Sequence, residues 1–127
     1  MKNSKSVAVL GGGSFGTVLA NLAASNGYNV SLWVRDSEQA LRINSEGANT
    51  TYHPELKLSK NIIASDNLKE VLNNKSIIFI ATPSIVFEQI VIRVSDYIDE
   101  KPYLVSCTKG ILDDPFRPLS EIISSKL

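Results

Sequence analysis

Hydrophobic residues occur in this chain as short unbroken runs, which alternate with stretches where apolar positions recur every three or four residues. The runs predict buried strands, and the stretches predict helices that cover them. Strands are expected at residues 7–10, 30–34, 62–64, 77–81 and 104–107. Helices are expected at about 14–25 and in segments that start near Asp36, Asp66, Pro83 and Pro115.

The helices carry apolar positions and caps that can be assigned in advance. Asp36 is expected to cap the second helix, with Gln39 as its reciprocal partner in a capping box. Residues 47–60 are expected to be irregular, because Pro54 breaks any helix there. The expected apolar positions are Phe15, Val18, Leu19, Leu22 and Ala23 in the first helix, and Ile85, Val86, Ile90 and Val94 in the fourth.

Strands that alternate with helices indicate an α/β fold with right-handed crossovers. We expect a Rossmann-type doubly wound parallel sheet of order 3-2-1-4-5, with helices on both faces. Its ligand crevice then lies at the carboxyl ends of the first and fourth strands, where the order reverses. The length of 127 residues suits a single domain, residues 1–127, and the last helix is expected to be cut short.

A glycine motif, Gly11-x-Gly13-x-x-Gly16, joins the first strand to the first helix. Gly11 permits a tight turn, Gly13 lets a pyrophosphate approach the backbone, and Gly16 lets the helix pack close to the strand. The helix N-terminus then offers N–H groups and a partial positive charge to the phosphates. The motif therefore predicts a site for a dinucleotide, NAD or NADP, where a plain glycine-rich turn is the alternative.

Three further residues are expected near this crevice. Arg35 ends the second strand 19 positions after Gly16, where an NAD site usually has Asp or Glu, and its guanidinium would favour a 2′-phosphate. A solvated surface charge is the alternative. Pro83 follows the fourth strand, and Lys109 follows the fifth, where a lysine could hold an anionic substrate group or polarise a carbonyl. By position alone Lys109 could equally be solvated.

Composition narrows the class of protein. The formal net charge is zero, and no basic patch interleaved with aromatic residues occurs, so we expect no nucleic-acid partner. Cys107 is the single cysteine and His53 the single histidine, so neither a disulfide nor a metal site is expected. No segment is long and apolar enough for an integral membrane span, and we expect a cytoplasmic protein.

With these motifs in place, the chain resembles the N-terminal domain of bacterial NAD(P)-dependent glycerol-3-phosphate dehydrogenase over nearly its whole length. The family pattern has Ala where Gly12 stands, and often Trp or Tyr where Phe15 stands. The residues that carry the resemblance are 11–17 (GGGSFGT), 32–36 (LWVRD), Asn49-x-x-Tyr52-x-Pro54, 81–84 (ATPS), Thr108-Lys109-Gly110 and 119–121 (LSE).

The resemblance implies roles for several residues. Ser14 and Phe15 would contact the pyrophosphate region, Arg35 the adenosine ribose or its 2′-phosphate, and Tyr52 the cofactor. Lys109 would bind both cofactor and substrate. The implied reaction is reversible hydride transfer between sn-glycerol 3-phosphate and dihydroxyacetone phosphate, which feeds phospholipid synthesis.

The family's catalytic lysine and most contacts to its small phosphorylated substrate belong to a helical C-terminal domain that this sequence lacks. We therefore expect no catalytic residue in this chain, and dinucleotide binding without turnover. The apolar face of the last expected helix could drive self-association, so a homodimer is kept open. Two other interpretations remain: a stand-alone, non-catalytic NAD(P)-binding module, or the N-terminal half of a dehydrogenase like 6-phosphogluconate dehydrogenase or ketopantoate reductase.

Overall fold

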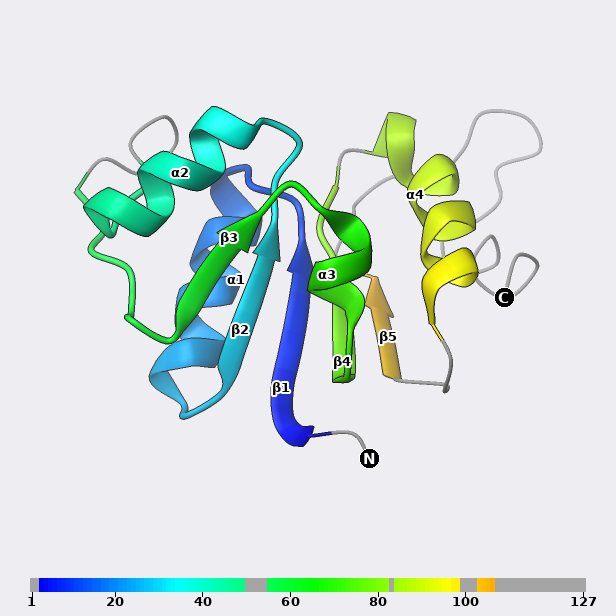
Figure 1. The fold of residues 1–127 in the computed structure, drawn as a ribbon, viewed down its shortest axis with the longest axis horizontal. Helices are drawn as coiled ribbons and strands as arrows, with labels where there is room; N and C mark the ends of the chain where they lie inside the picture. The colour runs from blue at the N-terminus through cyan, green and yellow to red at the C-terminus, as the bar shows by residue number, and fades with distance from the viewer. Residues whose placement is uncertain (1–2, 50–54, 83, 99–102, 107–127) are drawn as a thin grey trace.

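The fold is a five-stranded parallel sheet with helices on both faces, seen in a computed structural model that describes residues 3–49, 55–82, 84–98 and 103–106 (Figure 1). The strand order is β3-β2-β1-β4-β5, which confirms the predicted order. The strands are β1 (Asn3–Leu10), β2 (Asn29–Trp33), β3 (Ile62–Ser65), β4 (Lys75–Ile80) and β5 (Tyr103–Ser106). The helices are α1 (Ser14–Ser25), α2 (Ser37–Glu46), α3 (Leu68–Leu72) and α4 (Ser84–Tyr97).

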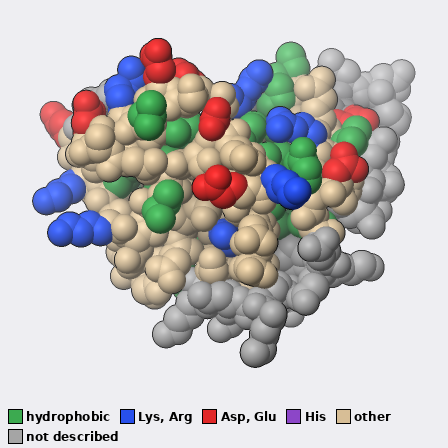
Figure 2. Space-filling model, viewed as in Figure 1, with side chains coloured by type: hydrophobic (Ala, Val, Ile, Leu, Met, Phe, Trp, Pro, Cys, Tyr) green, Lys and Arg blue, Asp and Glu red, His purple; other side chains and the backbone are tan. Residues whose placement is uncertain are grey.

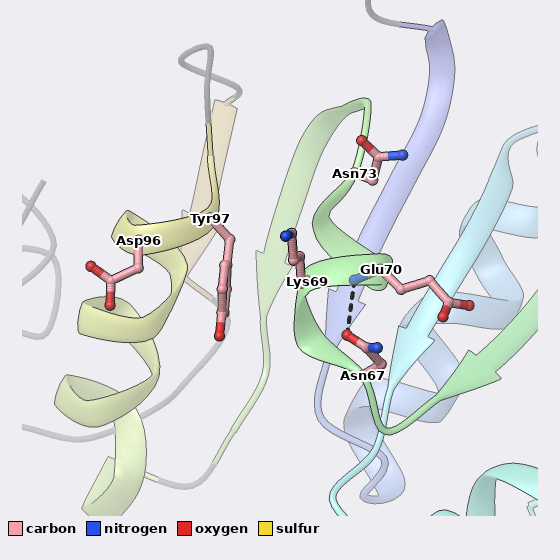
Figure 3. Close-up of a pocket in the computed structure, with 6 residues that line it drawn as sticks. All are labelled: Asn67, Lys69, Glu70, Asn73, Asp96 and Tyr97. Atoms are coloured by element: carbon pink, nitrogen blue, oxygen red, sulfur yellow. Dashed lines mark hydrogen bonds between the residues drawn. The ribbon is translucent and has the colours of Figure 1, made fainter.

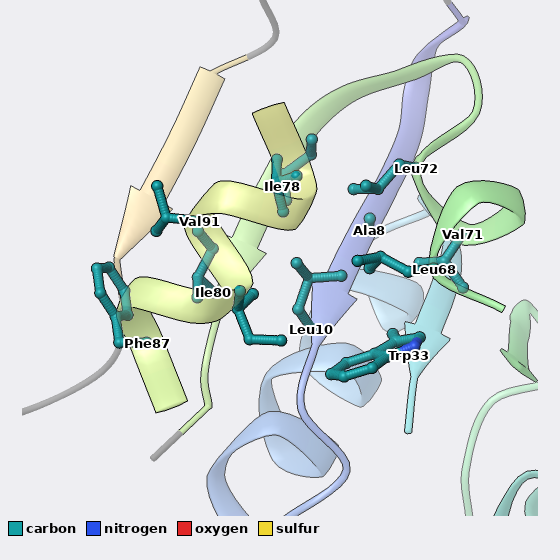
Figure 4. Packing of buried hydrophobic residues seen from close by; sticks show 12 residues of the cluster. Ala8, Leu10, Trp33, Leu68, Val71, Leu72, Ile78, Ile80, Phe87 and Val91 are labelled. Carbon is teal, nitrogen blue, oxygen red and sulfur yellow. The ribbon is translucent and has the colours of Figure 1, made fainter. Parts of the chain in front are cut away.

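Two hydrophobic layers hold the sheet, one on each face. Helices α3 and α4 cover one face, where Leu10 and Ile80 from the sheet pack with Phe87 of α4 (Figure 4). Helices α1 and α2 cover the other face, where Val9 and Leu32 are fully buried. Side chains alternate between these two layers along β1, as the pleat of a central strand requires.

The structure corrects the prediction for α1. The predicted apolar stripe faces the sheet only in part: Leu19 and Ala23 pack against the core, whereas Phe15, Val18 and Leu22 are exposed. The reason is close packing: only small side chains fit where α1 approaches β1 and β2. The residues of α1 that are buried are Gly16, Thr17, Ala20 and Ala24.

Two further predictions fail in detail. Ile85 was expected to be buried but is 87% exposed, whereas Phe87, Ile90 and Val94 of the same helix are buried.

Asp36 caps α2 as predicted, because its carboxylate accepts a hydrogen bond of 3.0 Å from the Glu38 N–H. The predicted capping box is wrong, however, because Gln39 bonds elsewhere.

Candidate functional site

The glycine turn between β1 and α1 lies at the carboxyl edge of the sheet, against the end of β4. The Gly11 N–H donates to the Trp33 carbonyl at 2.9 Å, and the Ala81 N–H donates to the Leu10 carbonyl at 2.8 Å. The structure therefore brings together the glycine turn, the end of β2 and the end of β4. This is the strand-order reversal where doubly wound sheets bind ligands.

Two of the glycines are required by close packing. Gly11 has a φ of +128°, and a Cβ there would lie 2.6 Å from the Ala81 carbonyl oxygen. A Cβ on Gly16 would collide with the carbonyl oxygen of Gly11. These two positions keep the turn tight and α1 close to β1, so both need glycine.

Gly13 has a different environment. No described atom lies within 4 Å of a Cβ built on it, so the backbone faces open space. Gly13 is also the N-cap of α1, and no side-chain hydrogen bond caps the helix. An uncapped helix N-terminus with open space before it suits an anionic group, because the helix dipole is positive at that end. Ser14 and Phe15 follow in the first turn, and both are exposed.

A largely buried network of side-chain amides binds the inner side of this turn. The sequence analysis did not predict this network. The Gly12 carbonyl accepts one hydrogen bond from Gln39 Nε2 at 3.0 Å and one from Asn49 Nδ2 at 2.8 Å. Asn49 Nδ2 also donates to Thr17 Oγ1 at 2.8 Å, and Thr17 Oγ1 donates to the Gly13 carbonyl at 2.7 Å. One clue to this network lies in the sequence, because Asn49 belongs to the Asn49-x-x-Tyr52-x-Pro54 motif that the chain shares with the family.

Arg35 lies at the carboxyl end of β2 and is exposed. It directly follows Val34, whose side chain fills the space next to Gly12. Arg35 therefore stands at the same edge as the glycine turn. Its neighbour Asp36 is engaged in capping α2, as expected.

Other predicted residues fall outside the part of the chain that the structure describes. These are Tyr52, Pro83 and Lys109, together with Cys107 and the last expected helix.

A separate pocket of about 700 Å³ lies between α3 and the end of α4 (Figure 3). It is lined by polar and charged side chains, among them Lys69, Glu70, Asp96 and Tyr97. None of the residues predicted for the site lines it. On the face shown in Figure 2, basic and acidic side chains are interspersed.

Among the described residues, no group of three or more His, Cys, Asp or Glu side chains is placed to hold a metal ion. None of the helices in this part of the chain is long and apolar enough to span a membrane.

A parallel sheet of order 3-2-1-4-5, with Gly-x-Gly-x-x-Gly between its first strand and first helix, defines an NAD(P)-binding Rossmann domain. The family model for the N-terminus of NAD-dependent glycerol-3-phosphate dehydrogenase matches residues 6–127. The chain belongs to this family.

Curated relatives agree with the family match. A glycerol-3-phosphate dehydrogenase [NAD(P)+] from Alcanivorax borkumensis is 44% identical over 116 residues, which cover 91% of this chain and 34% of the relative. One from Acinetobacter baylyi is 41% identical over 126 residues, covering 99% and 35%. The chain thus spans about a third of the length of these relatives.

Solved structures give the same result. A glycerol-3-phosphate dehydrogenase from Coxiella burnetii matches with a TM-score of 0.89 at 32% identity, covering 97% of this chain and 38% of that one. The yeast enzyme matches with a TM-score of 0.89 at 26% identity, covering 98% and 40%. A ketopantoate reductase from Ralstonia eutropha matches at 0.73 but only 14% identity, covering 96% and 38%, and so shares the fold alone.

Proposed function

We propose that this chain binds NAD(P) at the glycine turn and forms the cofactor-binding part of a glycerol-3-phosphate dehydrogenase. The observation that carries the proposal is Gly13, which faces open space at the uncapped N-terminus of α1. A pyrophosphate placed there would meet backbone N–H groups, the positive end of the helix dipole and no Cβ.

Each residue of the turn has a role in this proposal. Gly11 and Gly16 shape the turn, because a side chain at either position would strike backbone atoms. Gly13, Ser14 and Phe15 form the surface that the pyrophosphate approaches.

Arg35 would set the choice between the two dinucleotides. It is exposed at the end of β2, the strand that carries the ribose-binding residue in such sites. A guanidinium there forms charge-assisted hydrogen bonds to a 2′-phosphate, and it could also stack on adenine. We therefore propose that NADP(H) is accepted at least as well as NAD(H).

The whole-protein activity is carried over from the family. The reaction is reversible hydride transfer between sn-glycerol 3-phosphate and dihydroxyacetone phosphate, where the cofactor supplies the hydride chemistry. Lys109 would contact both cofactor and substrate, while Tyr52 and Pro83 would flank the cofactor. The proposal also includes a single NAD(P)-binding domain over residues 1–127, assembly as a homodimer and a cytoplasmic location.

Calorimetric titration of the 127-residue chain with NADPH and NADH, side by side, tests the binding site. Saturable binding of either supports it, and tighter NADPH binding that is lost in Arg35→Ala supports the 2′-phosphate role. If the folded chain binds neither dinucleotide, the proposed site is wrong. If Arg35→Ala leaves the NADPH dissociation constant unchanged, the role of Arg35 is wrong.

A second assay tests whether the chain turns over substrate. We expect negligible NADH oxidation in the presence of dihydroxyacetone phosphate, because the chain spans only about a third of its catalytic relatives. Robust oxidation by the purified chain would contradict this expectation.

A further inference from the structure

We propose that Asn49 is a positioning residue of the dinucleotide site, which holds the Gly12–Gly13 peptide so that the Gly13 N–H faces the pyrophosphate. This inference rests on the proposed function and names how the site is organised. It assigns a role to a buried residue on the inner side of the glycine turn, which does not itself face the ligand.

The first step is the burial and bonding of Asn49. Its side chain is 1% exposed, so its amide must find partners within the protein. It donates to the Gly12 carbonyl at 2.8 Å and to Thr17 Oγ1 at 2.8 Å, and its own oxygen accepts from Gln39 Nε2 at 3.2 Å. The amide is therefore held on both its nitrogen and its oxygen.

The second step is the geometry of one peptide group. The Gly12 carbonyl and the Gly13 N–H belong to the same planar trans unit, so they point in opposite directions. Asn49 and Gln39 bind the carbonyl from the buried side, at 2.8 and 3.0 Å. The Gly13 N–H is thereby directed away from the buried amides, and the same residue has open space beside its Cα, where a built Cβ would meet no described atom within 4 Å.

The third step is why this orientation needs support. Glycine has the widest backbone freedom of any residue, and residues 11–13 are three glycines in a row. Without a partner for the Gly12 carbonyl, this peptide could rotate and turn its N–H away from the ligand. A donor that is already in place lowers the ordering cost of binding, which is the advantage of a preorganised site.

The path of the chain explains how Asn49 reaches the turn. Gly47 ends α2 in the left-handed conformation, with a φ of +69°, which reverses the chain direction. The Gly47 carbonyl then accepts a hydrogen bond of 2.8 Å from the Leu58 N–H. Asn49 therefore returns to the glycine turn, while Gln39 reaches the same carbonyl from the start of α2.

The chain offers a matched control in Asn44, a second asparagine that binds backbone atoms. Its amide bonds Ala64 on β3, an edge strand that β2 separates from β1 and the glycine turn. Asn44→Ala likewise removes an amide that both donates and accepts hydrogen bonds, but it leaves the Gly12 carbonyl with both its donors.

The experiment compares NADH and NADPH affinity, thermal stability and the Gly13 amide signal in ¹⁵N-labelled wild type, Asn49→Ala, Gln39→Met and Asn44→Ala. We expect Asn49→Ala to weaken binding on the order of tenfold or more, as is usual for groups that orient a ligand-contacting group. Gln39→Met removes one of the two donors and should lose less. Asn44→Ala should bind within about twofold of wild type, because distant sites act independently. The Gly13 amide resonance should move in free Asn49→Ala and stay unmoved in free Asn44→Ala.

Each outcome decides. Loss of affinity in the two network variants, with Asn44→Ala unaffected, supports the role of Asn49. Equal losses in Asn44→Ala and Asn49→Ala, or unchanged affinity in folded Asn49→Ala, overturn it while the proposed function stands. If Asn49→Ala does not fold, Gln39→Met decides alone: weaker binding at unchanged stability supports the inference, and wild-type affinity overturns it. A wild-type chain that binds neither NADH nor NADPH overturns the inference and the proposed function together.

Discussion

Asn44 of α2 binds both backbone groups of Ala64 on β3: its amide nitrogen donates to the Ala64 carbonyl at 2.8 Å, and its amide oxygen accepts from the Ala64 N–H at 2.8 Å. Strand β3 is an edge of the sheet, so within the part of the chain that the structure describes these groups have no neighbouring strand on that side. One side chain thus replaces a strand partner at the centre of the edge. Such protection matters because unpaired edge groups template association with other chains.

We predict that Asn44→Ala lowers the free energy of unfolding by about 1–3 kcal/mol, since it leaves two backbone groups without their partners. Asn44→Asp should cost more, because it places a negatively charged carboxylate oxygen against the Ala64 carbonyl oxygen, where the Asn44 amide nitrogen donates. Urea unfolding measures both, with Ser45→Ala on the adjacent exposed position as the control. A loss no greater than that of Ser45→Ala would show that water replaces these bonds at no cost.

The glycines of the turn should separate stability from binding. Gly16→Ala should destabilise the fold strongly, because its Cβ would collide with the Gly11 carbonyl oxygen. Gly13→Ala should leave the unfolding free energy within about 1 kcal/mol of wild type, since its Cβ enters open space. The same Cβ should weaken NADH binding, because it occupies the path of the pyrophosphate. Denaturant unfolding measures the stability of both variants, and calorimetric titration with NADH measures their affinity. Wild-type affinity in Gly13→Ala would contradict the role of Gly13 as the place where the pyrophosphate approaches.

Gly12 should tolerate alanine only if Val34 becomes smaller. A Cβ on Gly12 would collide with Val34 Cγ1, although the family pattern has Ala at this position. We predict that Gly12→Ala and Val34→Ala each destabilise the chain, and that the double variant loses at least about 0.5 kcal/mol less than the sum. A double-mutant cycle by urea unfolding measures the coupling. Additive losses would show that the turn, and not Val34, moves to admit the methyl group.

Lys75 should make stability depend on alkaline pH. Burial lowers the pKa of Lys75 below its ordinary value of 10.5, an effect that the nearby Glu70 carboxylate opposes. The unfolded chain then holds the Lys75 proton up to a higher pH than the folded chain, so folding becomes more favourable as pH rises from the lowered pKa towards 10.5. Lys75 is partly exposed and donates to the Asn73 carbonyl at 2.8 Å, so we expect less than about 1 kcal/mol in total.

Unfolding of wild type and Lys75→Met across this alkaline range measures the effect. The stability of wild type relative to Lys75→Met should rise with pH over this range. A flat difference would show that Glu70 cancels the effect of burial, and a falling difference that Glu70 outweighs it; either would contradict the prediction.

The order of the sheet could be predicted from the sequence because local signals mark its strands and helices, and their alternation implies the doubly wound order. Apolar runs mark the strands, and the Gly11 turn marks the first crossover. The buried side of α1 could not be predicted in the same way. Its largest apolar residues form a stripe through Phe15, Val18 and Leu22, yet close approach to the sheet selects the small residues on the other side.

The candidate site was predictable where it is local or follows from the order of the strands. The turn and its glycines follow from consecutive residues, and the structure brings Ala81 beside Gly11. The amide network joins Gly12 to Gln39 and Asn49, which are 27 and 37 positions away. Such contacts leave no periodic trace, and a local rule assigned Gln39 to the wrong partner. Polar side chains that bond across the fold are set by tertiary packing alone.

Trp33 is the only tryptophan of the chain, and it is 3% exposed at the end of β2. Its indole N–H donates to the Asp66 carbonyl at 3.0 Å, the Arg93 guanidinium lies 5.6 Å from its ring centre, and its own carbonyl receives the Gly11 N–H. The chain also has four tyrosines, but this single buried indole is its one tryptophan fluorophore, with short-wavelength emission. Because the backbone carbonyl of Trp33 accepts the Gly11 N–H, the indole belongs to a residue that adjoins the glycine turn. A reduced nicotinamide cofactor held at the turn would take up the indole's excitation energy, and occupancy could be followed optically without a label.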